Sequence, residues 1–240
     1  MKFAKTMDQP VQRSGASRRV LLGRASFLAA MSCLALGLKA AGPLVAAKPQ
    51  SSEARKEKKG SKTITRTFSS PNAVIIDDDT TANPYPSTIQ VSGIKKGKVI
   101  DVNVRLRGIN HAFPDNIDVL LVAPNGASTV LMTDAGGSPD AVSVTLTLDD
   151  EAAEPLPDTT VLSNGSFKPA SYGGADTFPN VDAPSTTASL ALLNGGNPNG
   201  EWHLYVVDDA ATNSGAFSGG WDLQLTIKLD KKKKRRRSKK

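Results

Sequence analysis

The chain has 240 residues, and its 30 Lys and Arg outnumber its 23 Asp and Glu. That length allows one or two domains, and the single cysteine, Cys33, excludes a scaffold held together by disulfides. The charge is unevenly distributed: residues 67–230 contain 7 basic and 20 acidic side chains, a net charge of 7 − 20 = −13, and the segments on either side are cationic. An acidic body excludes general nucleic-acid binding by the folded domain, because phosphates would be repelled.

Residues 1–47 have the features of a targeting segment. The basic Ser17–Arg19 precedes an apolar run from Ala25 to Leu38, and the small residues Val45 and Ala47 precede a cleavage site before Lys48. This order is typical of a secretory signal peptide, and the run is shorter than the span of about 20 apolar residues that crosses a membrane. The arginine pair resembles a twin-arginine signal, and Sec export stays open. We therefore predict an exported bacterial protein, periplasmic or extracellular.

After a predicted charged linker at 48–66, the body at 67–230 alternates apolar and polar residues. Rows beginning at Ile100, Val142 and Trp221 have the period of two that a half-buried strand requires, and Ile117 to Ala123 is apolar on both faces. Asn-Gly pairs supply the turns between them. The pattern predicts an all-β fold, a jelly-roll β-sandwich of about eight strands with disordered termini.

Other stretches of the body give weaker indications. Residues 151–187, rich in Pro, Gly, Asp and Ser, predict a surface excursion with short strands at most, and residues 189–193 predict a short helical turn. Trp202 and Trp221 continue apolar rows, which favours core packing over a sugar-stacking platform. Phe113 and Tyr85 fall in predicted loops and are candidates for exposed contacts.

Four motifs carry a family resemblance: Pro84–Ile89, His111–Gly126, Gly200–Asp208 and Gly220–Leu223. In this order they resemble the P domain, or Homo B domain, of subtilisin-like proprotein convertases, from about Asn72 to Leu229. The resemblance implies a jelly-roll sandwich. In that family the domain follows a subtilisin-like catalytic domain and supports its folding, stability and calcium dependence.

No catalytic domain accompanies these motifs. A Ser-His-Asp triad needs a positioned imidazole, and the chain offers His111 and His203, for which structural roles are favoured. We therefore predict a non-catalytic module that binds or stabilises a protein partner. Two alternatives stay open. One is an accessory subunit or detached part of a subtilisin-like serine endopeptidase, and the other is an envelope adhesin or electrostatic tether.

Carboxylates are the most frequent chemical groups of the body, and several lie near predicted strand ends: Asp115, Asp118, Asp134, Asp208 and Asp209. Calcium takes several oxygen ligands from carboxylates, carbonyls and water, so these five are the candidate ligands of a calcium ion. The alternative is that they close turns, which is a common role of Asp. Calcium is the one cofactor that the sequence predicts.

The tail Lys231–Lys240 contains nine basic residues in ten. A mobile polycation of this kind binds anionic lipid, envelope polysaccharide or nucleic acid. A solubility tail without a partner is the equally weighted alternative.

Overall fold

The computed structural model describes residues 61–231. The predicted signal peptide, most of the predicted linker and the tail beyond Lys231 lie outside the described residues, so export and the domain boundaries stay predictions. Strand β1 begins at Thr63, so residues 63–66 of the predicted linker belong to a strand. Within residues 61–231, no helix is both long and apolar enough to cross a membrane.

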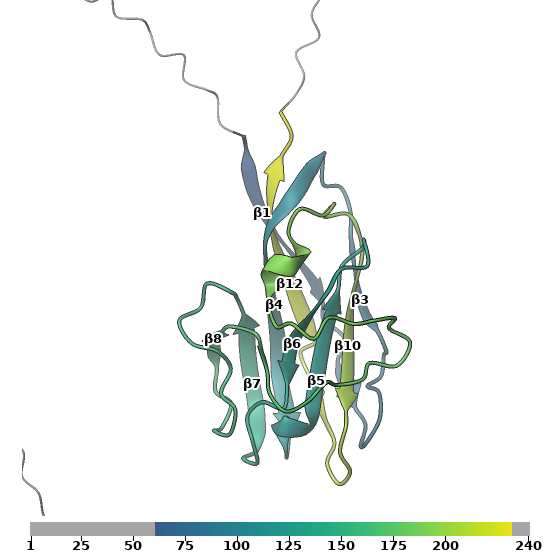
Figure 1. Cartoon of the computed structure of the whole chain (residues 1–240), viewed down its shortest axis with the longest axis vertical. Helices are drawn as coiled ribbons and strands as arrows, with labels where there is room; N and C mark the ends of the chain where they lie inside the picture. The colour runs from purple at the N-terminus through teal and green to yellow at the C-terminus, as the bar shows by residue number, and fades with distance from the viewer. Residues whose placement is uncertain (1–60, 232–240) are drawn as a thin grey trace, which may run out of the picture. The chain divides into compact units, whose positions relative to one another are not determined.

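The described chain folds into two β-sheets (Figure 1). The larger sheet has seven strands: β1 (Thr63–Ser70), β2 (Val74–Ile76), β4 (Gly97–His111), β7 (Ala141–Leu148), β8 (Gly165–Phe167), β11 (Gly215–Phe217) and β12 (Trp221–Leu229). The smaller sheet, in the order given, contains β3 (Ser87–Val91), β10 (Gly200–Asp208), β5 (Ile117–Val122), β6 (Ser128–Thr133) and β9 (Ala170–Ser171). The prediction of an all-β fold is confirmed.

Eight of these strands have five or more residues, and the other four are the short β2, β8, β9 and β11. The short strands escaped prediction because two or three residues carry no periodic pattern. The two 3-10 turns are η1 (Pro114–Asn116) and η2 (Leu190–Leu193), and η2 confirms the predicted helical turn. The jelly-roll connectivity stays a prediction.

The predicted alternation is confirmed along β12, where Trp221, Leu223, Leu225 and Ile227 are fully buried. It is wrong at two strand starts. Ile100 is 41 % exposed, because the register between β4 and β12 shifts there and turns Val99 inward instead. Val142 is 72 % exposed, and Ala141 before it is buried and pairs with the end of β4. Register shifts of this kind are β-bulges, which no pattern of period two anticipates.

The core lies between the sheets and includes both tryptophans. Trp202 is 1 % exposed and donates from Nε1 to the Pro198 carbonyl at 3.0 Å, and Trp221 is fully buried and donates to Ser87 Oγ at 3.0 Å. This confirms the interpretation of both as core residues. Burying large aromatic rings whose N–H groups find acceptors stabilises the contact between the sheets.

The stretch at 151–187 contains only the short strands β8 and β9, as predicted. It is more than a surface excursion, because its side chains Leu156 and Leu162 are buried in the main core. Farther along, Phe178 packs with Leu120 and Val207 in a second, smaller cluster. Leu120 and Val207 belong to central strands of the smaller sheet, so this stretch covers part of that sheet's outer face.

The two ends of the sandwich differ in the elements that meet there. The antiparallel neighbours β1 and β12 begin and end, respectively, at one end of the sandwich, since Thr63 pairs with Lys228 (Figure 1). The end of β4 at His111, the start of β5 and the end of β10 meet at the opposite end, since Ile117 pairs with Asp208. Most of the carboxylates predicted as ligands lie at this second end.

Candidate metal centre

Asp118 lies on the outer face of the smaller sheet, at the start of β5. Its neighbours Ile117 and Val119 point into the main core, so the alternation of the strand turns Asp118 the other way. Its partner across the sheet is Val207 of β10, and Asp209 follows two residues later. Asp118 is only 1 % exposed. A carboxylate is thus buried beside the apolar cluster of Leu120, Phe178 and Val207 on this face.

Three carboxylates meet at this position. One oxygen each from Asp118, Asp176 and Asp209 lies within 4.8 Å of the others. Neither oxygen of Asp118 has a hydrogen-bond partner among the described residues. Buried carboxylates are normally paired or hydrogen bonded, because leaving one unpaired costs several kcal/mol in order of magnitude. A cation, a proton on the carboxyl group or a donating water molecule could satisfy these oxygens.

The electrostatics of the cluster favour the same conclusion. Burial, followed by the carboxylates of Asp176 and Asp209, raises the pKa of Asp118 from 3.8 to about 9. The backbone amide of Asp134 lowers this pKa in part, without meeting the geometry of a hydrogen bond. Burial and Asp176 also raise the pKa of Asp209. Each shift reflects negative charge that has too little water or positive charge nearby.

Asp134 borders the cluster from the end of β6. Burial, then Asp176 and Asp209, raise its pKa to about 6. Its backbone has a φ of 48°, in the left-handed region, and Gly173 at φ 66° approaches it so closely that a Cβ there would collide with the Asp134 carboxylate. Glycine at 173 is therefore required for this close approach.

A hollow of about 420 Å³ opens beside Asp134. It is lined by Phe113, Asp115, Asp134, Gly137, Ser138, Asp158, Thr159, Tyr172 and Gly173. Asp115, on η1, is half-buried and faces this hollow, outside the group of three ligand atoms. Phe113 is half-buried here as well, whereas Tyr85 packs edge-on against Tyr205 at a ring distance of 5.0 Å. Of the two aromatics predicted for exposed contacts, Phe113 borders the acidic region.

Asp208 has a different environment from its neighbour Asp209. Its Oδ2 lies 2.9 Å from Nε2 of His111, its Oδ1 accepts from the Ala210 amide at 3.2 Å, and both side chains of the pair are fully buried. Nδ1 of His111 contacts the Phe113 backbone, with the carbonyl oxygen at 2.9 Å and the amide nitrogen at 3.2 Å. The carboxylate predicted as a ligand is thus satisfied by a histidine, in the polar structural role expected for His111.

The structure therefore groups Asp118 and Asp209, places Asp134 beside them and Asp115 at the rim, and separates Asp208. Asp176 joins them without having been predicted. Its local sequence, Gly-Gly-Ala-Asp, resembles any polar loop, and its position depends on the packing of Phe178 two residues later. This contact, together with the pairing of β9 with β6 just before it, brings Asp176 to Asp118.

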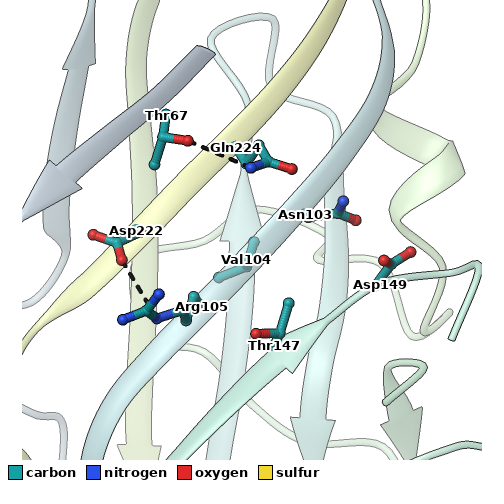
Figure 2. A pocket seen from close by; sticks show the side chains of 8 residues that line it. All are labelled: Thr67, Asn103, Val104, Arg105, Thr147, Asp149, Asp222 and Gln224. Carbon is teal, nitrogen blue, oxygen red and sulfur yellow. Dashed lines mark hydrogen bonds and ion pairs between the residues drawn. The ribbon is translucent and has the colours of Figure 1, made fainter. Parts of the chain in front are cut away.

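A second hollow, of about 280 Å³, lies on the polar outer face of the larger sheet (Figure 2). There Asp222 stands between two cations, 3.7 Å from Arg105 and 3.5 Å from Arg107, and Gln224 donates to Thr67 at 3.4 Å. Asp222 is thus compensated by cations, whereas no ion pair does the same for Asp118, Asp176 or Asp209 among the described residues.

Comparisons with known proteins add little. No family model matches the chain, and no curated protein sequence matches it. Two structures containing the serine protease of Aeromonas sobria align with it. The complex of that protease with its chaperone gives a TM-score of 0.38 and 13 % identity over 72 % of this chain, and the protease alone gives 0.36 and 12 % over 69 %. This chain spans 28 % and 27 % of the matched chains. The P-domain resemblance thus rests on its motifs.

Proposed function

We propose that this protein is an exported, non-catalytic binding module that is stabilised by a calcium ion at its acidic end, the end of the sandwich that contains Asp118, Asp176 and Asp209. The observation that carries the proposal is the buried carboxylate of Asp118, which faces Asp176 and Asp209 and has no hydrogen-bond partner within residues 61–231. A divalent cation at their centre would compensate two of the three negative charges. Oxygens within 4.8 Å of one another fit a cation that sits 2.3–2.6 Å from each.

The donor set favours calcium over softer metals. All three groups are carboxylates, with no histidine or cysteine among them, and oxygen donors suit calcium, magnesium or manganese. Calcium accepts six to eight oxygens in irregular geometry, so backbone carbonyls, water and the nearby Asp134 would complete its shell. Magnesium demands a near-octahedral arrangement, which makes it the informative comparison.

A protein partner with a cationic segment suits the adjoining hollow. Asp115, Asp134 and Asp158 line it together with the rings of Phe113 and Tyr172. Carboxylates attract Lys and Arg side chains, and aromatic faces contact them favourably. A narrower form of the proposal makes the partner a subtilisin-like protease, to which the chain would be an accessory subunit.

The surroundings of both histidines support a non-catalytic role. The His111 side chain is fully buried against Asp208 and reaches no substrate. His203 lies on an exposed strand face, where Nδ1 contacts Thr88 Oγ1 at 2.9 Å and Nε2 is 3.8 Å from Glu201. Thr88 and His203 are cross-strand partners, so their contact follows from sheet pairing. Among the described residues, neither ring contacts a serine or a cysteine.

Thermal unfolding of the full chain tests the calcium site. Titration with calcium should raise the melting temperature relative to chelator, because a ligand that binds only the folded state stabilises it, by about 2.7 kcal/mol at a concentration of 100 Kd. Asp118→Asn and Asp176→Asn should each abolish the rise, and Asp182→Asn, at an exposed position outside the cluster, should keep it. Magnesium should give a smaller rise. A melting temperature that calcium leaves unchanged would refute the site.

A further inference from the structure

The end of the sandwich opposite the carboxylates gathers lysines from three segments of the chain. The Leu229 amide donates to the Lys62 carbonyl at 2.8 Å, and the Asp230 amide donates to the Lys96 carbonyl at 2.9 Å. These bonds bring together the entry into β1, the turn before β4 and the exit from β12. The exposed lysines of this surface, called the lysine end below, are Lys62, Lys95, Lys96, Lys98, Lys228 and Lys231.

Two of these lysines are direct cross-strand neighbours. Lys98 of β4 pairs with Lys228 of β12, and like charges at opposed positions destabilise a sheet. Lys98 donates to the Gly195 carbonyl at 2.6 Å, and no ion pair links any lysine of this end to a carboxylate within the described residues. Both line a hollow of about 350 Å³ with Lys231 and Asp230. A bound anion would relieve this repulsion.

The distribution of cations supports an anionic ligand. Residues 67–230 contain seven basic side chains, and four of them, Lys95, Lys96, Lys98 and Lys228, belong to the lysine end. Two of the other three, Arg105 and Arg107, face Asp222. The sequence continues directly from Lys231 into further basic residues. Most of the positive charge of residues 67–230 thus lies at the end of the domain from which the sequence continues into the basic tail.

Two exposed aliphatic side chains decide which anionic ligand fits. Ile100, two residues after Lys98, is 41 % exposed, and Leu192 of η2 is 47 % exposed. Segment 190–196 lies against the start of β4, since the Gly195 amide donates to the Val99 carbonyl at 2.8 Å. Lysines beside exposed aliphatic groups are the combination that binds the interface of an anionic membrane. A nucleic-acid backbone would contact the lysines and leave both apolar side chains in water.

The carboxylate cluster at the opposite end does not oppose such binding. β4 runs from Gly97 at the lysine end to His111 at the acidic end. Its 15 residues span roughly 45 Å at about 3.3 Å per residue. Charges are screened over about 8 Å at physiological ionic strength, so the carboxylate cluster lies several screening lengths from a surface held at the lysine end.

We propose that the lysine end docks the folded domain on an anionic lipid surface and directs the acidic end away from it. The lysines of the described domain supply part of the affinity, in addition to the basic tail. Each lysine near an anionic lipid surface contributes about fivefold in affinity. This proposal is independent of calcium binding, which concerns the other end.

Binding of the full chain to vesicles of phosphatidylglycerol and phosphatidylcholine, followed by co-sedimentation, tests the proposal. The double variant Lys98→Gln, Lys228→Gln should bind roughly 25-fold more weakly, and the charge-matched control Lys168→Gln, Arg66→Gln should bind as the wild type does. All variants keep residues 1–60 and 232–240, so a difference in affinity reports on the folded domain. Equal binding by the two double variants would overturn the proposal.

A second pair of measurements separates lipid from other polyanions. Ile100→Ser with Leu192→Ser should weaken vesicle binding and leave binding to duplex DNA unchanged. Tighter binding to DNA than to vesicles, together with no effect of the serine variant on vesicles, would identify a general polyanion site and refute the lipid assignment. Unchanged melting temperatures would show that the variants fold.

Discussion

The two ends of the sandwich are built from the same long strands but handle charge differently. At the acidic end, Asp118 is buried under a loop without a hydrogen-bond partner among the described residues, so a charge on it would destabilise the folded state. At the lysine end, Lys98 and Lys228 repel each other in water, where the cost is small. Burial, more than the number of charges, determines which end affects stability. The acidic end is expected to determine the stability of the domain, and the lysine end to determine the surface to which the protein binds.

The largest effect is expected from the buried pair at the acidic end. Asp208→Ala would leave the buried ring of His111 and the Ala210 amide without their acceptor, and each buried donor left unsatisfied costs about 1–3 kcal/mol. Chemical denaturation should show this loss both with calcium and with chelator, because Asp208 serves the histidine. A loss that appears only with calcium would instead make Asp208 a ligand.

A gain in stability is expected from a substitution on the neighbouring strand β5. Asp118→Asn removes a buried carboxyl group that must either stay charged or take up a proton on folding, so in chelator the variant should be more stable than the wild type, by about 1–3 kcal/mol. Calcium should then stabilise the wild type alone. Equilibrium denaturation with chelator measures this directly, with Asp182→Asn as the neutral control. A destabilised variant in chelator would show that the carboxylate is satisfied without a cation.

The pH dependence of the free energy of unfolding follows from the Asp118 carboxyl group. The pKa of Asp118 rises from 3.8 to about 9 on folding, so between these values the folded state binds a proton that the unfolded state has lost. In chelator, the free energy of unfolding should therefore fall as the pH rises from about 4 to about 9, and Asp118→Asn should flatten this slope. Saturating calcium should also flatten it, since the metal replaces the proton. A stability that rises with pH in chelator would contradict the shift.

The smallest effect is expected at the lysine end. Lys228→Gln removes the repulsion with Lys98, so the free energy of unfolding should rise by less than about 1 kcal/mol and should not respond to calcium. Raising the salt concentration should abolish the gain. A large loss of stability would show that Lys228 has a structural partner in the folded protein.

The sequence predicted much of the fold because large parts of it are local. Trp221 to Ile227 alternate without interruption, and their burial follows. Ile100 was misplaced because the bulge beside it is set by the partner strand β12. The four short strands likewise depend on neighbours to which they bind, with too few residues for a pattern.

The candidate site was predictable only in part. Adjacent residues on a strand point to opposite faces of the sheet. The inner face of β10 therefore carries Trp202, Leu204, Val206 and Asp208, and the alternation alone separates Asp208 from Asp209. Applying it would have removed Asp208 from the ligand set. Asp176 had no such signal, since a loop must return across the sheet to place it. A ligand that arrives by tertiary packing is beyond any local pattern.

The pairing of β1 with β12 also determines how the domain would respond to mechanical load. Thr63 lies opposite Lys228, and these antiparallel neighbours begin and end at the same end of the sandwich. A force that pulls the start of β1 away from the end of β12 would therefore separate these two strands one residue pair at a time, beginning at Thr63 and Lys228. Such peeling loads few hydrogen bonds at once, so the domain should open at low force. A pulling force of this kind would detach β1 first and leave the acidic end folded.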